Sequence, residues 1–153
     1  MPASKQSNLG TTSTVCEDRL MTSYISHTTV DCADAYTLSV FWRAVLDYDE
    51  DPEDPNLPGH EECMIFSTDR THRILFIEVP DAKPGKNRIH FDLRPVEGRR
   101  DEELARLIDL GAKPLYDLRK PDGSGWVTLG DPEGNEFCIL RSEAELAAGS
   151  QAG

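Results

Sequence analysis

The sequence predicts an α+β fold made of two similar modules, each with a strand, a helix and then two or three further strands. Both halves of the chain open on a β-branched or alternating segment, residues 24–31 and 87–94, and a helical pattern follows each of them. Each opening segment contains a histidine, His27 and His90, that lies roughly 50 residues before the end of its half. This repeated order predicts two modules of the same plan, with one strand of the first half lost in an acidic loop.

The first module is predicted to span residues 23–80. After the opening strand, apolar side chains recur at helical spacing over residues 31–48, and Asp34 stands at the N-cap position. Residues 49–60 contain three prolines among acidic residues, so we expect an acidic loop there in place of one strand. Two short strands complete the module, ECMIFS (62–67) and RILFIEV (73–79).

The second module is predicted to span residues 87–142. Its opening strand, NRIHFDLR, alternates apolar and polar side chains, as a half-buried strand does. Residues 101–114 predict a helix with acidic residues in its first turn and Gly111 near its C-terminal cap. If a helix covers one face of each sheet, the histidine-bearing faces line a shared pocket. Three closing strands are predicted, at residues 114–120, 125–131 and 135–141.

The two ends of the chain differ from this folded body. Residues 1–22 are rich in polar side chains, which predicts a disordered N-terminal extension, and residues 143–153 are predicted to form a flexible C-terminal tail. The N-terminal residues contain no apolar run long enough for a signal peptide, and no stretch has ~18 consecutive apolar residues, so we expect a cytoplasmic protein that does not engage a membrane.

The charge and the cysteines exclude some classes of partner and structure. A net charge of −12 repels phosphate backbones, so we expect no nucleic-acid partner. The cysteines show no Cys-x-x-Cys spacing and no disulfide-scaffold density, so free thiols are expected. They are Cys16, Cys32, Cys63 and Cys138.

Four motifs in order carry a resemblance to a known superfamily. They are ISHTTVDCADA, KNRIHFDL, LIDLGAKP and WVTLGDPEGNEFCIL, between residues 24 and 142. In this order the chain resembles the vicinal oxygen chelate superfamily, in particular its glyoxalase-like branch. The resemblance implies the fold shared by glyoxalases, bleomycin-resistance proteins and dihydroxybiphenyl dioxygenases, in which two βαβββ modules form a cupped mixed sheet. It also implies a small-molecule ligand in the cup and a homodimer.

The resemblance also implies a set of metal ligands, because metal-using members take them from the first and last strands of each module. Carried over to this chain, His27 and His90 fall on the two first-strand positions. The closing-strand position, where a glutamate is usual, falls on Cys138. Glu136 is the nearest carboxylate, but a shift of two residues moves its Cα by about 6.6 Å along the strand. The fourth position falls on Ile77 or Glu78, and the apolar strand leaves its register open.

This donor set decides which metal the site suits. Two histidines and a carboxylate suit a divalent Zn, Ni, Mn or Fe ion with open positions for substrate oxygens, whereas a cysteine thiolate favours Zn. The structural alternative is two strand histidines bonded to their neighbours and a small buried cysteine. Glu136 is the first candidate for a catalytic acid–base residue. The candidate substrate-binding residues are Arg88, Asp92, Trp126 and Phe76.

Two functions therefore stand as hypotheses. The first is a metal-dependent glyoxalase-like lyase or isomerase, in which an ion polarises the carbonyl of a small oxygenated substrate and Glu136 moves a proton. The second is a metal-free protein that binds or sequesters a small molecule, as bleomycin-resistance proteins do. It is motivated by Cys138, and by Ile77 if that residue faces the cup.

Overall fold

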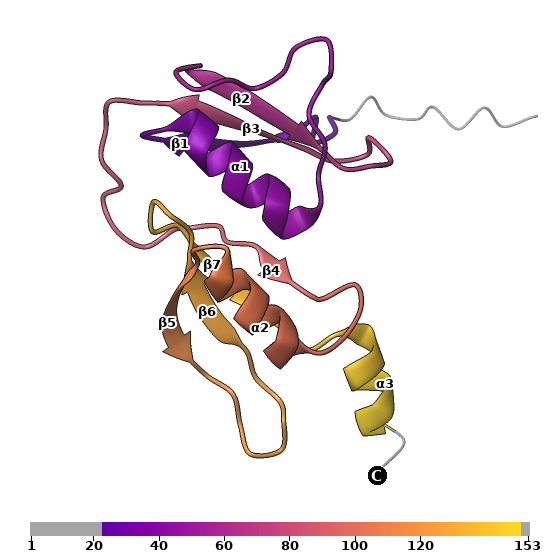
Figure 1. Cartoon of the computed structure of the whole chain (residues 1–153). Helices are drawn as coiled ribbons and strands as arrows, with labels where there is room; N and C mark the ends of the chain where they lie inside the picture. Colours follow the sequence, from indigo (N-terminus) through magenta and orange to yellow (C-terminus); the bar gives the residue numbers. More distant parts are fainter. Residues whose placement is uncertain (1–22, 151–153) are drawn as a thin grey trace, which may run out of the picture.

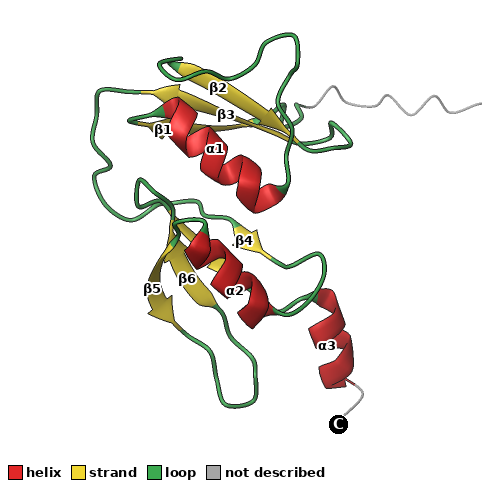
Figure 2. Cartoon of the chain, viewed as in Figure 1, coloured by secondary structure: helices red, strands yellow, loops and turns green. Residues whose placement is uncertain are grey.

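The computed structural model describes residues 23–150, so the predicted N-terminal extension lies outside the described residues. Two mixed sheets lie side by side, with strand orders β1-β3-β2 and β4-β7-β6-β5. Helices α1 (Ala35–Leu46) and α2 (Arg100–Asp109) each lie across one face of a sheet, on the same side of the molecule (Figures 1 and 2). The predicted α+β class is confirmed. The strands are two separate sheets rather than one continuous sheet.

In the first module, β1 (Thr28–Cys32) pairs in parallel with β3 (Arg73–Glu78), and β3 pairs antiparallel with β2 (Glu62–Phe66). Helix α1 begins where predicted, because the Asp34 side chain accepts a hydrogen bond from the Thr37 backbone N–H at 2.8 Å. It ends where Asp47 adopts a left-handed conformation with φ of 54°.

The acidic segment 49–60 takes the place of the missing strand without forming one. Asp49 and Phe66 exchange two backbone hydrogen bonds of 2.8 and 2.9 Å. The Asn56 side chain then bonds both backbone groups of Met64, at 2.9 and 3.1 Å. An amide side chain presents the donor and acceptor of a peptide group, so it covers the edge of β2 where the three prolines prevent a regular ladder.

The second module contains β4 (Asp92–Leu93), α2, β5 (Lys113–Asp117), β6 (Val127–Gly130) and β7 (Glu136–Ile139). The predicted opening strand, residues 87–94, was too long, since only Asp92 and Leu93 pair as a strand. The segment before β4 does not pair with a strand at Asn87. The Asn87 backbone N–H instead donates a hydrogen bond to the Glu136 carboxylate at 3.0 Å.

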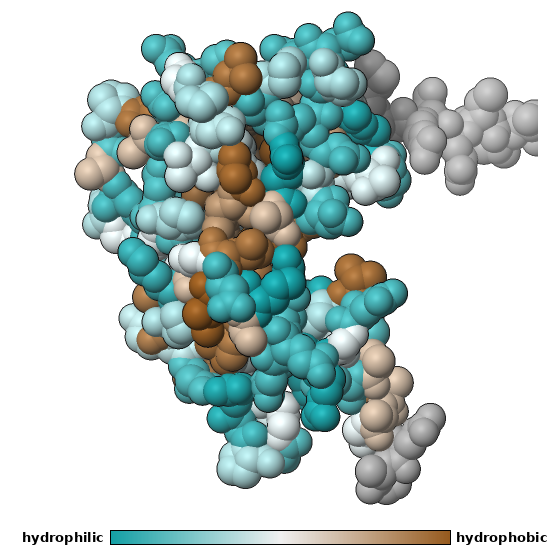
Figure 3. Space-filling view, in the orientation of Figure 1, coloured by the Kyte–Doolittle hydropathy of each residue, from teal (hydrophilic) through white to brown (hydrophobic). Residues whose placement is uncertain are grey.

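One apolar core runs through both modules. The Phe137 ring of β7 contacts Phe41 and Trp42 of α1, with ring centroids 6.3 and 5.0 Å apart. The Trp42 ring also contacts Phe91 at 5.5 Å. Figure 3 shows apolar side chains gathered at the junction of the two modules on the helix side. Edge-to-face aromatic packing of this kind adds to the burial of each ring, so the junction is a continuous core.

The C-terminal tail prediction was wrong for residues 143–150, which form helix α3 (Glu143–Ser150). The missed signal is a capping box: the Ser142 hydroxyl accepts from the Glu145 N–H, and the Glu145 carboxylate accepts from the Ser142 N–H. Glu145 also accepts the Arg100 N–H at 2.8 Å, which ties α3 to the start of α2.

Replacing Glu145 with alanine should therefore lower the free energy of unfolding by about 1–2 kcal/mol, because it removes a cap and leaves the Arg100 N–H without this acceptor. Urea unfolding followed by circular dichroism measures the change, with the exposed Glu143→Ala as the matched control. Equal effects of the two substitutions would contradict the capping role.

Acid should weaken the fold through two exposed aspartates. Hydrogen bonds from the Thr71 N–H and from the Ser67 and Thr71 hydroxyls lower the pKa of Asp69 to about 2. The Arg119 guanidinium lowers the pKa of Asp117 to about 2. Both values lie below the usual 3.8, so this stabilisation is complete above about pH 4 and is lost as the pH falls toward 2.

We expect the urea midpoint to fall between about pH 4 and pH 2. The fall should be smaller in the Asp69→Asn, Asp117→Asn double variant, which lacks both titrating groups. The same pH dependence in the wild type and the double variant would show that other groups control acid unfolding.

Candidate metal centre

The face of the second sheet away from α2 carries a row of polar side chains. Cys138 of β7 lies between two register partners, Asp92 of β4 and Thr128 of β6. Asp92 and Thr128 therefore stand on the same face as the thiol. His90 precedes Asp92 by two residues and lines the same hollow of about 330 Å³. The other lining residues are Lys86, Tyr116, Leu118, Trp126, Glu136 and Leu140.

Three of these side chains bring metal-binding atoms together. The ligand atoms of His90, Asp92 and Cys138 all lie within 4.8 Å of one another. His90 Nε2 and Asp92 Oδ1 are 3.4 Å apart, and their side chains are 43% and 58% exposed. Cys138 is buried beneath them. The group thus has an imidazole and a carboxylate open to the hollow and a thiol at its floor.

The thiol is held protonated in the free protein. Burial raises the pKa of Cys138, the Thr128 hydroxyl partly opposes this effect, and the Asp92 carboxylate raises the pKa further. The Thr128 Oγ1 lies 3.5 Å from Cys138 Sγ. Because the thiolate is the nucleophile and the metal ligand, this thiol is unreactive until a cation replaces its proton.

Glu136 lies outside the group of three and serves another contact. Its Oε2 accepts the Asn87 N–H at 3.0 Å and lies 3.2 Å from Lys83 Nζ. Burial alone would raise its pKa, but the hydrogen bonds from Asn87 and Lys83 outweigh burial, so the pKa of Glu136 is lowered. Glu136 is thus an ionised carboxylate that anchors the segment between the two modules and also lines the hollow.

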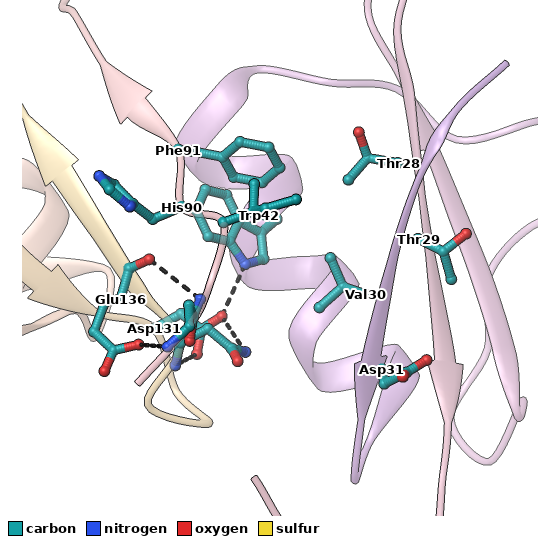
Figure 4. A pocket seen from close by; sticks show the side chains of 12 residues that line it. Thr28, Thr29, Val30, Asp31, Trp42, His90, Phe91, Asp131 and Glu136 are labelled. Atoms are coloured by element: carbon teal, nitrogen blue, oxygen red, sulfur yellow. Dashed lines mark hydrogen bonds between the residues drawn. The ribbon is translucent and has the colours of Figure 1, made fainter. Parts of the chain in front are cut away.

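His27 also lies outside the group of three. It precedes β1 rather than lying within it, and its Nδ1 is 3.1 Å from Ser26 Oγ. In Figure 4 the His90 ring points away from the side chains of β1. A metal role for His27 therefore stays a prediction, and among the described residues the ligand atoms grouped with His90 are those of Asp92 and Cys138.

The register of β3 is now clear. The Glu78 carboxylate accepts from the Ala35 N–H at 3.3 Å, so Glu78 lies on the helix side of the first sheet. Ile77, the next residue in the alternation, lies on the open side with its register partner Asp31. The fourth position implied by the resemblance therefore holds an isoleucine.

The structure separates the four candidate substrate-binding residues. Asp92 and Trp126 line the hollow. Arg88 is exposed and does not line it. Phe76 is fully buried, and it belongs to the core rather than to the open face. The sequence placed Phe76 on the wrong face because β3 is apolar on both faces, so its alternation could not be read.

A residue that the sequence reasoning missed lies in the turn between β6 and β7. Asp131 is fully buried and accepts a hydrogen bond from Trp42 Nε1 at 3.1 Å (Figure 4). It also accepts from the backbone N–H groups of Glu133 and Asn135, at 3.0 and 2.9 Å. An aspartate before a turn glycine is ordinary turn chemistry, so the bond to Trp42 has no signal in the sequence.

The same turn holds the start of α1. The Glu133 carboxylate accepts from the backbone N–H groups of Ala33 and Asp34, at 2.8 and 2.9 Å. Asp131 and Glu133 together fix the first module to the second. Asp131 also borders a second hollow of about 250 Å³, between β1 and residues 87–91 (Figure 4).

Comparison with protein families decides the identity of the fold. The sequence profile of the glyoxalase-like domain family matches residues 27–140, most of the chain. The chain belongs to this family. It is therefore a member of the vicinal oxygen chelate superfamily, as the motifs had indicated. No curated protein matches this glyoxalase-like chain in sequence.

Solved structures support the fold assignment of this glyoxalase-like domain. It is similar to the fosfomycin resistance protein FosX from Listeria monocytogenes, crystallised as a single-residue mutant with Mn(II) and 1S,2S-dihydroxypropylphosphonic acid. That match has a TM-score of 0.59 and 19% identity over 82% of this chain and 94% of the other. FosX from Mesorhizobium loti matches with a TM-score of 0.56 and 17% identity, over 84% of this chain and 99% of the other. A possible glyoxalase from Bacillus cereus matches with a TM-score of 0.54 and 14% identity, over 76% of this chain and 97% of the other.

Within residues 23–150, no helix is long and apolar enough to cross a bilayer.

Proposed function

We propose that this glyoxalase-like protein is a metal-dependent enzyme that acts on a small oxygenated substrate in the hollow of the second sheet. The observation that carries the proposal is the group of His90, Asp92 and Cys138, whose ligand atoms lie within 4.8 Å of one another on the floor of that hollow. The Mn(II) in the similar FosX structure is consistent with a metal on this fold.

The donor set fits a divalent ion. Two ligands bound at about 2.0–2.1 Å to a tetrahedral ion lie about 3.3–3.4 Å apart. His90 Nε2 and Asp92 Oδ1 already have this spacing, at 3.4 Å. Three protein ligands leave a position open, and a metal bound there would act as a Lewis acid toward a substrate oxygen.

The other side chains of the hollow suggest the kind of substrate. Trp126, Tyr116 and Leu118 form an apolar wall, and Lys86 brings a positive charge to a protein that is otherwise strongly acidic. A small molecule with an apolar part and an anionic group fits these walls. Glu136 is the residue we propose to move a proton, because it is ionised and lines the same hollow.

The first experiment tests metal-dependent turnover. Protein made without a histidine tag is stripped with a chelator, reloaded with Zn, Ni, Mn or Fe, and assayed on thiol adducts of α-ketoaldehydes and on epoxide phosphonates. We expect turnover of one substrate class with a reloaded metal and none in the stripped protein. Failure to bind any metal would overturn the proposal.

The second candidate is a metal-free binding protein. It is favoured by the protonated thiol at the floor of the hollow and by Ile77 at the position where a further ligand would stand. Thermal shift with a small-molecule library in the presence of a chelator separates the two functions. Ligands that stabilise the chelated protein without turnover would favour this candidate.

We also propose that the protein is a cytoplasmic homodimer. Each sheet is covered by a helix on one side, and the open side of the second sheet exposes Tyr116, Leu118 and Trp126. A second copy that packs against the rim of the hollow would shield this apolar surface and leave the hollow itself for the substrate. Light scattering at micromolar concentration should give twice the chain mass of 17.1 kDa, whereas a monomer would reject the dimer.

A further inference from the structure

Strand β7 carries a thiol at the position where the resemblance places a carboxylate ligand, and a carboxylate stands directly beside it on the next strand. We propose that Asp92 supplies the carboxylate of this metal site from β4, and that Cys138 makes the site select Zn²⁺ over Mn²⁺. This inference rests on the proposed function, because it assigns the ligands and the metal class of that same site.

The register of the two strands puts the carboxylate in place. Asp92 and Cys138 are register partners in the parallel pair of β4 and β7, so their side chains point to the same face. Neighbouring strands are about 4.8 Å apart, which lets both side chains reach one ion. Asp92 is 58% exposed and makes its close contact with His90, so its carboxylate is free to turn toward the thiol.

The alternative carboxylate, that of Glu136, is already bound to other groups of the protein. Glu136 lies two residues from Cys138, about 6.6 Å along the strand. Its Oε2 is held by the Asn87 N–H at 3.0 Å and lies 3.2 Å from the Lys83 ammonium. Moving Glu136 to the metal would break both contacts and release the segment that joins the modules. Asp92 needs no such rearrangement.

The geometry needs only a small adjustment at the thiol. A sulfur at about 2.3 Å and a nitrogen at about 2.0 Å from a tetrahedral ion lie about 3.5 Å apart. The Cys138 Sγ starts within 4.8 Å of the other two ligand atoms. Rotation of the exposed His90 and Asp92 side chains can close this difference, since neither is held by packing.

The thiolate sets the preference among metals. Thiolate ligands suit Zn²⁺ and similar thiophilic ions, whereas Mn²⁺ prefers carboxylate, carbonyl and water oxygens. Thr128 lies beside the sulfur, with Oγ1 3.5 Å from Cys138 Sγ, and its hydroxyl can donate to the thiolate and orient it. The site of this chain, which includes a thiolate, should therefore select a different class of metal ion from a site on the same fold whose ligands are only imidazoles and oxygens.

The test uses full-length protein and four variants: Cys138→Ser, Asp92→Asn, Glu136→Gln, and the double variant Asp92→Asn, Cys138→Glu, which moves the carboxylate back to β7. Competition dialysis with Zn²⁺ and Mn²⁺ measures selectivity, and Co²⁺ absorption detects a metal–sulfur bond. Circular dichroism checks that each variant folds.

We expect the wild type to prefer Zn²⁺ by about 100-fold or more and to show a near-ultraviolet sulfur-to-cobalt band. The band should vanish in Cys138→Ser. Asp92→Asn should lose at least about tenfold in Zn²⁺ affinity, and Glu136→Gln should keep its affinity. The double variant should bind Mn²⁺ with the Zn²⁺ preference reduced by at least about tenfold.

The outcomes separate this inference from the proposed function. A wild type that binds no metal overturns both. A wild type that binds metal without the sulfur band overturns the role of Cys138 and leaves the proposed function standing, and this readout needs no variant. Loss of affinity in Glu136→Gln with none in Asp92→Asn overturns the relocation of the carboxylate.

Discussion

Replacing Asp131 with alanine should lower the free energy of unfolding by about 3–5 kcal/mol. The carboxylate is fully buried and accepts hydrogen bonds from Trp42 Nε1 and from the backbone N–H groups of Glu133 and Asn135. The Asn135 side-chain amide donates to it as well, so four donors lose this acceptor at the junction of the modules, and each unpaired buried donor costs about 1–3 kcal/mol. Urea unfolding at neutral pH measures the loss.

Asp122 provides the matched control for this substitution. It occupies the other aspartate-containing turn of the second module, where it accepts from the Ser124 N–H and hydroxyl but is exposed. Asp122→Ala should cost about 1 kcal/mol or less. A double-mutant cycle of Asp131→Ala with Trp42→Phe should show coupling of about 0.5–3 kcal/mol, because the two side chains share one hydrogen bond. Equal losses in the two aspartate variants would refute the role of Asp131 in joining the modules.

Replacing His90 with alanine should weaken zinc binding by at least about 100-fold. The expected effect exceeds the roughly 10–100-fold typical of an outer-shell partner, because His90 is proposed to bind the ion directly. Isothermal titration calorimetry on tag-free protein measures the affinity. His60→Ala is the control, since His60 is the last residue of the acidic segment and lies outside the group of three. A His90→Ala protein with unchanged affinity would remove His90 from the site.

A His27→Ala variant reports on the remaining histidine. Within one chain His27 is outside the group of three ligands, so zinc affinity should change little if that group is the complete site. A loss as large as that of His90→Ala would show that His27 joins the metal site, as the resemblance implied.

The pattern of the sequence was enough to predict the two modules. The Asp34 cap and the helical spacing of α1 are local signals, and local signals set the type and order of elements. The alternation of residues 87–94 was less reliable, since Ile89 is exposed and only Asp92 and Leu93 pair as a strand. Helix α3 carried a local signal as well, the Ser142–Glu145 capping box, which the small polar composition of the tail obscured.

The identity of the side chains that form the site depends on contacts between distant segments, which local signals do not encode. The faces of Phe76 and Ile77 follow from the register of β3 against β1, which an apolar strand does not reveal. The pairing of Asp92 with Cys138 follows from a two-residue parallel ladder between segments far apart in the chain. Glu136 was well placed by spacing alone, but its contacts with Asn87 and Lys83 change its role.

The most direct test of the metal centre is diffraction from zinc-loaded crystals at the zinc absorption edge. We predict an anomalous peak in the hollow of the second sheet, about 2.3 Å from Cys138 Sγ and about 2.0–2.2 Å from a His90 nitrogen and an Asp92 oxygen. A peak bound by other residues, or loaded crystals without a peak in this hollow, would contradict the proposed site.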